Sequence, residues 1–140
     1  MTSQLNLEKI DYRKLNGRQQ ESYNFQKISG ILADYGFTTI LLRDDWNGAD
    51  FIAQHGDGKT VLRVQLKGRL HVNKKYMGKD LWLCFPADGG WYLCPHDEIL
   101  SLLLNSTGIG KTKSWCHAGG YDYPTPPKQV ATILKRFLLK

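Results

Sequence analysis

Four polar side chains on neighbouring segments form a candidate site for metal-dependent hydrolysis. Glu21 lies in a helical segment, Asp50 opens a strand-like segment, and Gln65 and Lys67 alternate on the next such segment. Mg²⁺ commonly takes one or two carboxylates and fills its remaining positions with water and phosphate oxygens. Glu21, Asp50 and the Gln65 side-chain carbonyl offer such oxygens, and the Leu66 backbone carbonyl is a further donor. Lys67 can orient the attacking water or offset phosphate charge, so the set suits phosphodiester cleavage.

The first helix, predicted over residues 17–35, carries Glu21. Its apolar residues recur at spacings of three and four: Phe25, Ile28, Leu32 and Tyr35. At about 100° per residue, Glu21 falls in the middle of this stripe. We therefore expect its carboxylate to be buried and to need a cation or an ion-pair partner. The alternative is that Glu21 lies at the open end of the stripe, where it reaches water or a lysine.

Three strand-like segments follow the helix and position the other candidates: 37–42, 49–54 and 60–67. A Gly-Asp-Gly-Lys turn joins the second and third as a hairpin. Side chains alternate faces along a strand, so Arg63, Gln65 and Lys67 share one face. Hairpin pairing then brings Asp50 close to Gln65 and Lys67. The alternatives are a turn-capping Asp50 after Asn47-Gly48 and an ordinary solvent-exposed polar face.

The remaining segments complete an α/β arrangement. A second hairpin, a helix, a long loop and a last helix are expected over 81–85 with 91–94, 95–105, 106–124 and 125–138. The last helix begins at Thr125-Pro126-Pro127 and carries an apolar stripe. This order predicts an α/β fold with a mixed sheet flanked by helices.

Composition restricts the class of protein. At 140 residues and 16.0 kDa, the chain is expected to form one domain, 1–140. Its net charge of +6 favours a polyanionic partner, although a basic protein need not have one. The N-terminal residues show no secretory signal, no apolar run is long enough for a bilayer, and the three cysteines favour a reducing compartment. We therefore expect an intracellular, cytoplasmic protein without a membrane partner.

The helical Glu, the strand-opening Asp and a Gln-x-Lys triplet fifteen residues later resemble the PD-(D/E)xK nuclease superfamily. Restriction enzymes, Holliday-junction resolvases and some homing endonucleases belong to it. The resemblance covers roughly residues 17–95 and implies a restriction-endonuclease-like αβββαβ core. Three departures are visible. Ala49 replaces the Pro of the motif, Gln65 replaces the acidic residue, as in some members, and the segment after Lys67 is short for the family helix.

The same resemblance implies roles for four residues of this chain. Glu21, Asp50 and Gln65 match metal-site positions, and Lys67 matches the catalytic lysine; all four are the expected catalytic residues. The implied cofactor is Mg²⁺, with Mn²⁺ as a substitute.

Basic residues surround these positions and predict contacts to DNA phosphates. The candidates are Arg63, Arg69, Lys74, Lys75, Lys79, Lys111 and Lys113. Aromatic residues of 110–123, such as Trp115, either stack on bases or anchor their loop to the core. The expected function is a metal-dependent DNA endonuclease, a hydrolase of homing, restriction or resolvase type. A chain this small that cuts both strands, or reads a long site, is expected to work as a homodimer or higher homo-oligomer. The alternative is a catalytically inactive nuclease-fold module that binds DNA or protein.

Overall fold

The computed structural model describes residues 4–140, apart from the side chain of Asp45. The main helices are α1 (Gly17–Asp34), α2 (His96–Ser106) and α3 (Lys128–Leu134). The strands are β1 (Phe37–Trp46), β2 (Ala49–His55), β3 (Val61–Leu66), β4 (Leu70–Asn73), β5 (Leu81–Ala87), β6 (Gly90–Pro95) and β7 (Gly120–Tyr123). Single helical turns are η1 (Tyr12–Lys14), η2 (Lys74–Tyr76), η3 (Ile109–Lys111), η4 (Ser114–Ala118) and η5 (Lys135–Phe137).

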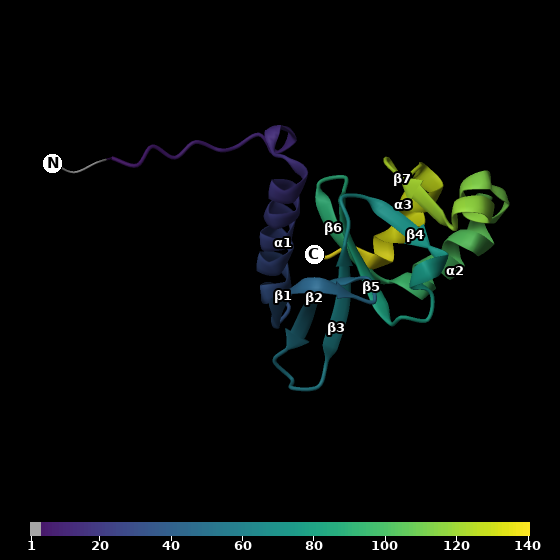
Figure 1. Ribbon diagram of the computed structural model, residues 1–140, viewed down its shortest axis with the longest axis horizontal. Helices are drawn as coiled ribbons and strands as arrows, with labels where there is room; N and C mark the ends of the chain where they lie inside the picture. Colours follow the sequence, from purple (N-terminus) through teal and green to yellow (C-terminus); the bar gives the residue numbers. More distant parts are fainter. Residues whose placement is uncertain (1–3) are drawn as a thin grey trace.

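The strands form a five-stranded mixed sheet in the order β1-β2-β3-β5-β6. Neighbours are antiparallel except β3 and β5, which run parallel. Strands β4 and β7 form a separate antiparallel pair. The predicted α/β fold, a mixed sheet flanked by helices, is confirmed, and Figure 1 shows α1 on one side with α2 and α3 on the other.

Apolar side chains fill both faces of this sheet, so the fold has three layers. On one face, Ile28 and Leu32 of α1 pack against β2 and β3 through Phe51 and Val64. On the other face, β5 and β6 pack against α2, α3 and the β4–β7 pair. Strand β5 alternates between the two clusters, with Cys84 on the α1 side and its neighbours on the other. Burial on both faces explains why its sequence is almost continuously apolar.

Helix α1 begins and ends close to the predicted positions because both signals are local. Asn16 accepts a hydrogen bond from the Gln19 N–H, and the Gln19 side chain accepts one from the Asn16 N–H, each at 2.9 Å. This capping box satisfies two N–H groups that the helix itself cannot pair. Gly36, with φ at +87°, follows the last turn.

Four features differ from the prediction. The last helix is shorter than expected, because α3 begins at Lys128 after Pro127 and ends at Leu134, where η5 follows. Strand β1 continues to Trp46, and β4 and β7 were not predicted. Among the described residues, β4 and η2 provide the crossover between parallel β3 and β5, where the family core has a helix. Residues 106–124 contain η3, η4 and β7 rather than a plain loop. None of the helices within residues 4–140 is both long and apolar enough to span a bilayer.

Candidate active site

A cavity of about 500 Å³ opens where β2 begins and β3 ends. All four predicted catalytic residues line it: Glu21 from α1, Asp50 from β2, Gln65 from β3 and Lys67 directly after β3. The structure therefore brings together residues that are separated by up to 46 positions in the sequence. Lysines 75 and 79 also line this cavity, which we call the Gln65 cavity.

The β2–β3 hairpin places Asp50 at the end of β3. Phe51 lies opposite Val64, so the next pair outward is Asp50 with Gln65. Asp50 is exposed whereas Phe51 is buried, as the predicted alternation requires. Its Oδ2 accepts a hydrogen bond from the Leu66 backbone N–H at 2.7 Å. This contact orients the carboxylate before any ligand binds.

Gln65 is the buried member of the set, with only 3% of its surface exposed. Its Nε2 donates to the Gly48 carbonyl at 3.2 Å. Rotating the amide by 180° would place oxygen against oxygen, so this contact defines which end is the carbonyl. The Oε1 atom is buried without a hydrogen-bond partner among the described residues. Such an atom lacks about 1–3 kcal/mol of interaction that water or a cation would restore.

The turn before β2 determines how Gly48 meets Gln65. Asn47 and Gly48 have φ angles of +55° and +91°, and Trp46 pairs with Ala49 across them. This is the two-residue Asn-Gly turn that hairpins favour. A Cβ atom on Gly48 would lie 2.9 Å from the Tyr76 ring. Glycine is therefore required both for the backbone conformation and for the close approach of Tyr76.

Glu21 lines the cavity, but the prediction that its carboxylate is buried was wrong. Its side chain is exposed, and the buried residues of α1 are Asn24, Ile28 and Leu32. The apolar contacts of the helix with the sheet begin at Phe25, one turn later. The alternative stated above, the open end of the stripe, is what the structure shows. Glu21 is therefore a solvated carboxylate beside the cavity rather than a desolvated one.

The donor set fits a hard divalent cation. Within residues 4–140, no three histidine, cysteine, aspartate or glutamate side chains cluster closely enough to hold a metal. The Gln65 cavity instead offers two carboxylates together with the orphaned Gln65 Oε1. Mg²⁺ matches this combination because it needs few protein ligands and retains several waters.

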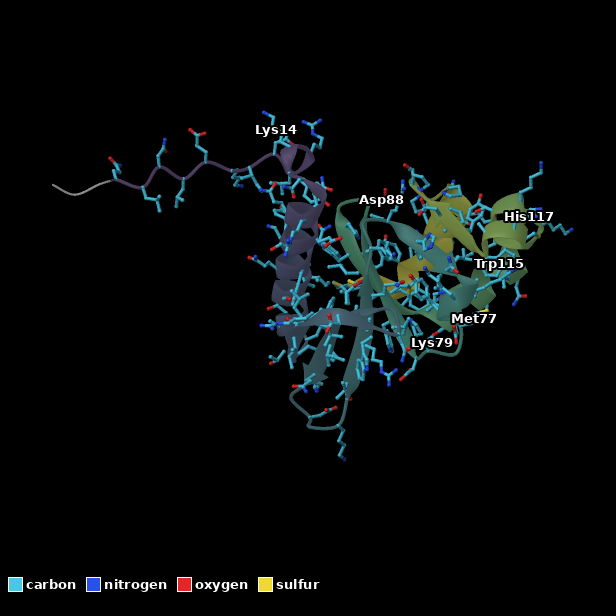
Figure 2. The ribbon with its side chains drawn as sticks, viewed as in Figure 1. Lys14, Met77, Lys79, Asp88, Trp115 and His117 are labelled. Atoms are coloured by element: carbon cyan, nitrogen blue, oxygen red, sulfur yellow. The ribbon has the colours of Figure 1, made fainter. Side chains whose placement is uncertain are left out.

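Two of the predicted DNA-binding residues, Lys75 and Lys79, line this cavity, whereas Arg63 and Lys74 do not. Figure 2 shows Lys79 close to Met77 on the segment that leads into β5. The Arg63 guanidinium lies 4.7 Å from the Trp46 ring centroid and donates to the Lys79 carbonyl at 3.3 Å. The Lys74 ammonium lies 5.0 Å from the Trp115 ring. Arg63 thus stabilises the Lys79 backbone at the cavity rim.

The other predicted DNA-binding residues do not line the Gln65 cavity. Arg69 lines a second cavity and pairs with Asp122 at 2.9 Å. Lys111 ends η3 and Lys113 directly precedes η4, and neither lines either cavity. Trp115 is buried in the core, so the anchoring alternative describes it and base stacking does not.

The sequence reasoning missed Gly48 and Tyr76, which complete the Gln65 cavity. The Asn47-Gly48 turn was recognisable, but its carbonyl contact to Gln65 depends on the hairpin register. Tyr76 packs edge-on against His96, with ring centroids 5.8 Å apart, across a separation of 20 residues. No local pattern identifies a contact of that kind.

No protein-family model matches the sequence, and no curated protein matches it. Among solved structures, the fold is similar to that of a Holliday junction resolvase from Archaeoglobus fulgidus. The two chains share 13% identity over 54% of this chain and 72% of that chain, with a TM-score of 0.43. A likeness at this level does not show what the protein does.

Proposed function

We propose that the protein is a metal-dependent DNA endonuclease of the PD-(D/E)xK type that hydrolyses phosphodiester bonds. The observation that carries this proposal is the orphaned, buried Gln65 Oε1 in a cavity also lined by two carboxylates and a lysine. The cofactor is Mg²⁺, for which Mn²⁺ can substitute.

Glu21, Asp50 and Gln65 would hold the cation. When bound, it polarises a phosphoryl oxygen and acidifies a water molecule. Asp50 is oriented for this role by the Leu66 N–H, which removes reorganisation when the ligand arrives. Exposed Glu21 completes the anionic pair from α1, where its side chain is free to adjust to the ligand.

Lys67 is the positive group of the chemistry. It directly follows β3, and its backbone N–H donates to the Cys84 carbonyl of β5 at 2.9 Å. From this fixed point, its ammonium offsets charge on the attacked phosphate and orients the incoming water.

DNA is the proposed substrate because basic side chains, which suit phosphate, line the same cavity. Lys75 and Lys79 line it, and the whole chain carries a net charge of +6. Such groups supply sequence-independent affinity for a phosphate backbone. We propose one intracellular domain over residues 1–140 that acts as a homodimer or higher homo-oligomer, because two symmetry-related sites can each cut one strand of a duplex.

Cleavage of supercoiled plasmid, linear duplex and four-way junction DNA in Mg²⁺, Mn²⁺ or EDTA tests the proposal. We expect cleavage that depends on the divalent metal. The cleavage rate should fall about 10²-fold or more in Asp50→Asn and Lys67→Ala and should not change in Lys59→Ala. Lys59 is the matched control because it is exposed and lines neither cavity. Cleavage that persists in Asp50→Asn would contradict the assignment.

The second candidate is a catalytically inactive DNA- or protein-binding module. The observation that favours it is Gln65 itself, a neutral side chain where the motif has an acid. Wild-type protein that binds DNA without cutting it in Mg²⁺ or Mn²⁺ would establish this alternative.

A further inference from the structure

A second cavity adjoins the Gln65 cavity at the end of β3. It has a volume of about 540 Å³ and shares Lys67 and Gly68 with its neighbour. Its other lining residues come from three separate parts of the chain: Tyr12, Gln20, Arg69, His71 and Asp122. We call it the Arg69 cavity. Lys67 therefore lines both cavities.

Positive charge exceeds negative charge in the Arg69 cavity. Lys67 and Arg69 are its cations, and Asp122 is the carboxylate that lines it. Arg69 Nε lies 2.9 Å from Asp122 Oδ2, and His71 Nδ1 lies 3.6 Å from Asp122 Oδ1. Asp122 thus holds both side chains in position, while 55% of the Arg69 side chain remains exposed. The guanidinium can contact an anion without leaving its partner.

Neutral hydrogen-bond groups of Tyr12 and Gln20 also line the Arg69 cavity. The Tyr12 hydroxyl accepts a hydrogen bond from Asn24 Nδ2 at 2.9 Å, so its own O–H hydrogen can be donated to a ligand. The Gln20 amide donates to the Tyr12 carbonyl at 3.3 Å and fixes η1 against α1. The residues that line the cavity therefore include a hydroxyl donor, a guanidinium and an ammonium, a combination that suits phosphate oxygens.

His71 lies in a positive environment when no ligand is present. Burial has the largest effect and lowers the pKa of His71, and the charge of Lys67 lowers it further. Asp122 acts in the opposite direction, and Lys75 adds a smaller lowering effect. An anion placed beside Lys67 and Arg69 would offset the lowering effect of Lys67 on the pKa of His71.

We propose that the Arg69 cavity binds the backbone phosphate next to the one held at the Gln65 cavity, on the same DNA strand. This inference rests on the proposed function in that it takes DNA as the ligand. Because both cavities share Lys67, a strand that follows them has two successive phosphates on either side of one lysine. The Arg69 cavity would then determine which phosphodiester bond is placed for cleavage.

The decisive experiment is a pair of variants on one ion pair. Binding of a short fluorescein-labelled duplex is measured by anisotropy in EDTA, which removes metal and cleavage from the result. Arg69→Gln should weaken binding about tenfold and reduce the slope of log K against log salt by about one. Asp122→Asn should strengthen binding about threefold, because it removes a negative charge that repels the phosphate and leaves a side-chain oxygen that can still accept from Arg69.

A purely structural ion pair gives a different pattern. Both variants would then lower the melting temperature, and their affinities would fall together or stay unchanged; either result overturns the proposal, as does a wild type that binds no DNA. Arg136→Gln is the matched control, since it makes the same charge change at an exposed arginine that lines neither cavity.

Substrate chemistry locates the site independently. Single methylphosphonate substitutions along the strand should reveal one position that weakens wild-type binding but has no further effect in Arg69→Gln. Inorganic phosphate should displace the duplex no better than chloride at equal ionic strength. Specific displacement that disappears in Arg69→Gln would instead assign the cavity to a free anion.

Cleavage in Mg²⁺ is measured separately, so the two proposals can fail independently. If the wild type does not cut DNA but Arg69→Gln and Asp122→Asn change the affinity in opposite directions, the endonuclease proposal is refuted and this phosphate site is retained. Normal cleavage with no effect of Arg69→Gln on binding would do the reverse.

Discussion

Gln65→Glu is the most informative substitution because it changes one buried atom from an amide nitrogen to a carboxylate oxygen. In the protein, Nε2 donates to the Gly48 carbonyl at 3.2 Å and Oε1 has no partner among the described residues. The variant loses that donor and places a negative charge at a side chain that is 3% exposed, beside Asp50. Without metal it must be destabilising, and with metal it gains an anionic ligand.

The metal-free penalty has an upper limit, because the new carboxyl can protonate instead of remaining charged. Burial and the neighbouring Asp50 raise its pKa above the ordinary value of about 4.3. Each pH unit above that value adds at most about 1.4 kcal/mol, which gives a limit of about 3.7 kcal/mol at pH 7. At pH 5 the limit is about 1 kcal/mol. A folded state with a raised acid pKa becomes less stable as pH rises, so the penalty must grow from pH 5 to pH 7.

Divalent metal should reverse part of this loss. A ligand at a hundred times its dissociation constant stabilises the folded state by about 2.7 kcal/mol. If the added carboxylate strengthens Mg²⁺ binding tenfold, the variant gains about 1.4 kcal/mol more than the wild type at the same saturating concentration. The variant should therefore be the less stable protein in EDTA and the more metal-responsive one.

Urea unfolding at pH 5 and pH 7, in EDTA and across a Mg²⁺ series, measures all of these quantities. Gln54→Glu is the matched control, because Gln54 is exposed on β2 and lines neither cavity. Its stability should change little under any condition. An identical Mg²⁺ response in Gln65→Glu and the wild type would show that Gln65 does not face the metal, and the assignment of the cavity would be wrong.

Three further predictions test the fold around the site. Ile28→Ala should lower the free energy of unfolding by about 2–4 kcal/mol in urea, because that side chain is completely buried between α1 and the sheet; a loss under about 1 kcal/mol would contradict this packing. Hydrogen bonds from Thr60, above all from its side-chain hydroxyl, lower the pKa of Asp57. The stability that they provide is therefore fully present above the ordinary carboxyl pKa and is lost as pH falls through the lowered pKa. Asp57→Asn should therefore lower the melting temperature more at pH 7 than at pH 2, where much of this stability is already lost in the wild type, and an equal decrease at both would refute the reasoning. Burial raises the pKa of the β5 and β6 cysteines, so a thiol reagent at pH 8 should modify exposed Cys116 alone until denaturant is added, as mass spectrometry would show.

The grouping of Asp50, Gln65 and Lys67 was predictable because a hairpin makes it a local property. A turn signal and a side-chain period of two are enough to bring these residues to one point. The burial of Glu21 was predicted wrongly for a related reason. A helical wheel gives the direction in which a side chain points, but not how far along the helix the sheet extends. Here the contact begins at Phe25, so Glu21 has the predicted direction without the burial.

Strands β4 and β7 could not be predicted from local pattern. Each has four residues, and their pairing joins Leu70 to Tyr123 across 53 positions. A strand this short shows too few alternations to be distinguished from a loop. The segment after β3 therefore gives no strand signal of its own, and the cavity that it lines together with η1 and α1 is not predictable from local pattern. Arg69 was recognised as a basic residue, but its pairing with Asp122 depends on this long-range register.

The same long-range dependence applies to the centre of the proposed site. Lys67 follows a strand whose parallel neighbour is β5, and its N–H is held by the Cys84 carbonyl at 2.9 Å. Asp50 is held by the Leu66 N–H, one residue earlier. One edge of the β3 end thus orients the carboxylate, and the other fixes the backbone from which the lysine extends. Loosening β5 should therefore make the position of the Lys67 ammonium less well defined in both cavities, even though no residue of β5 lines either of them.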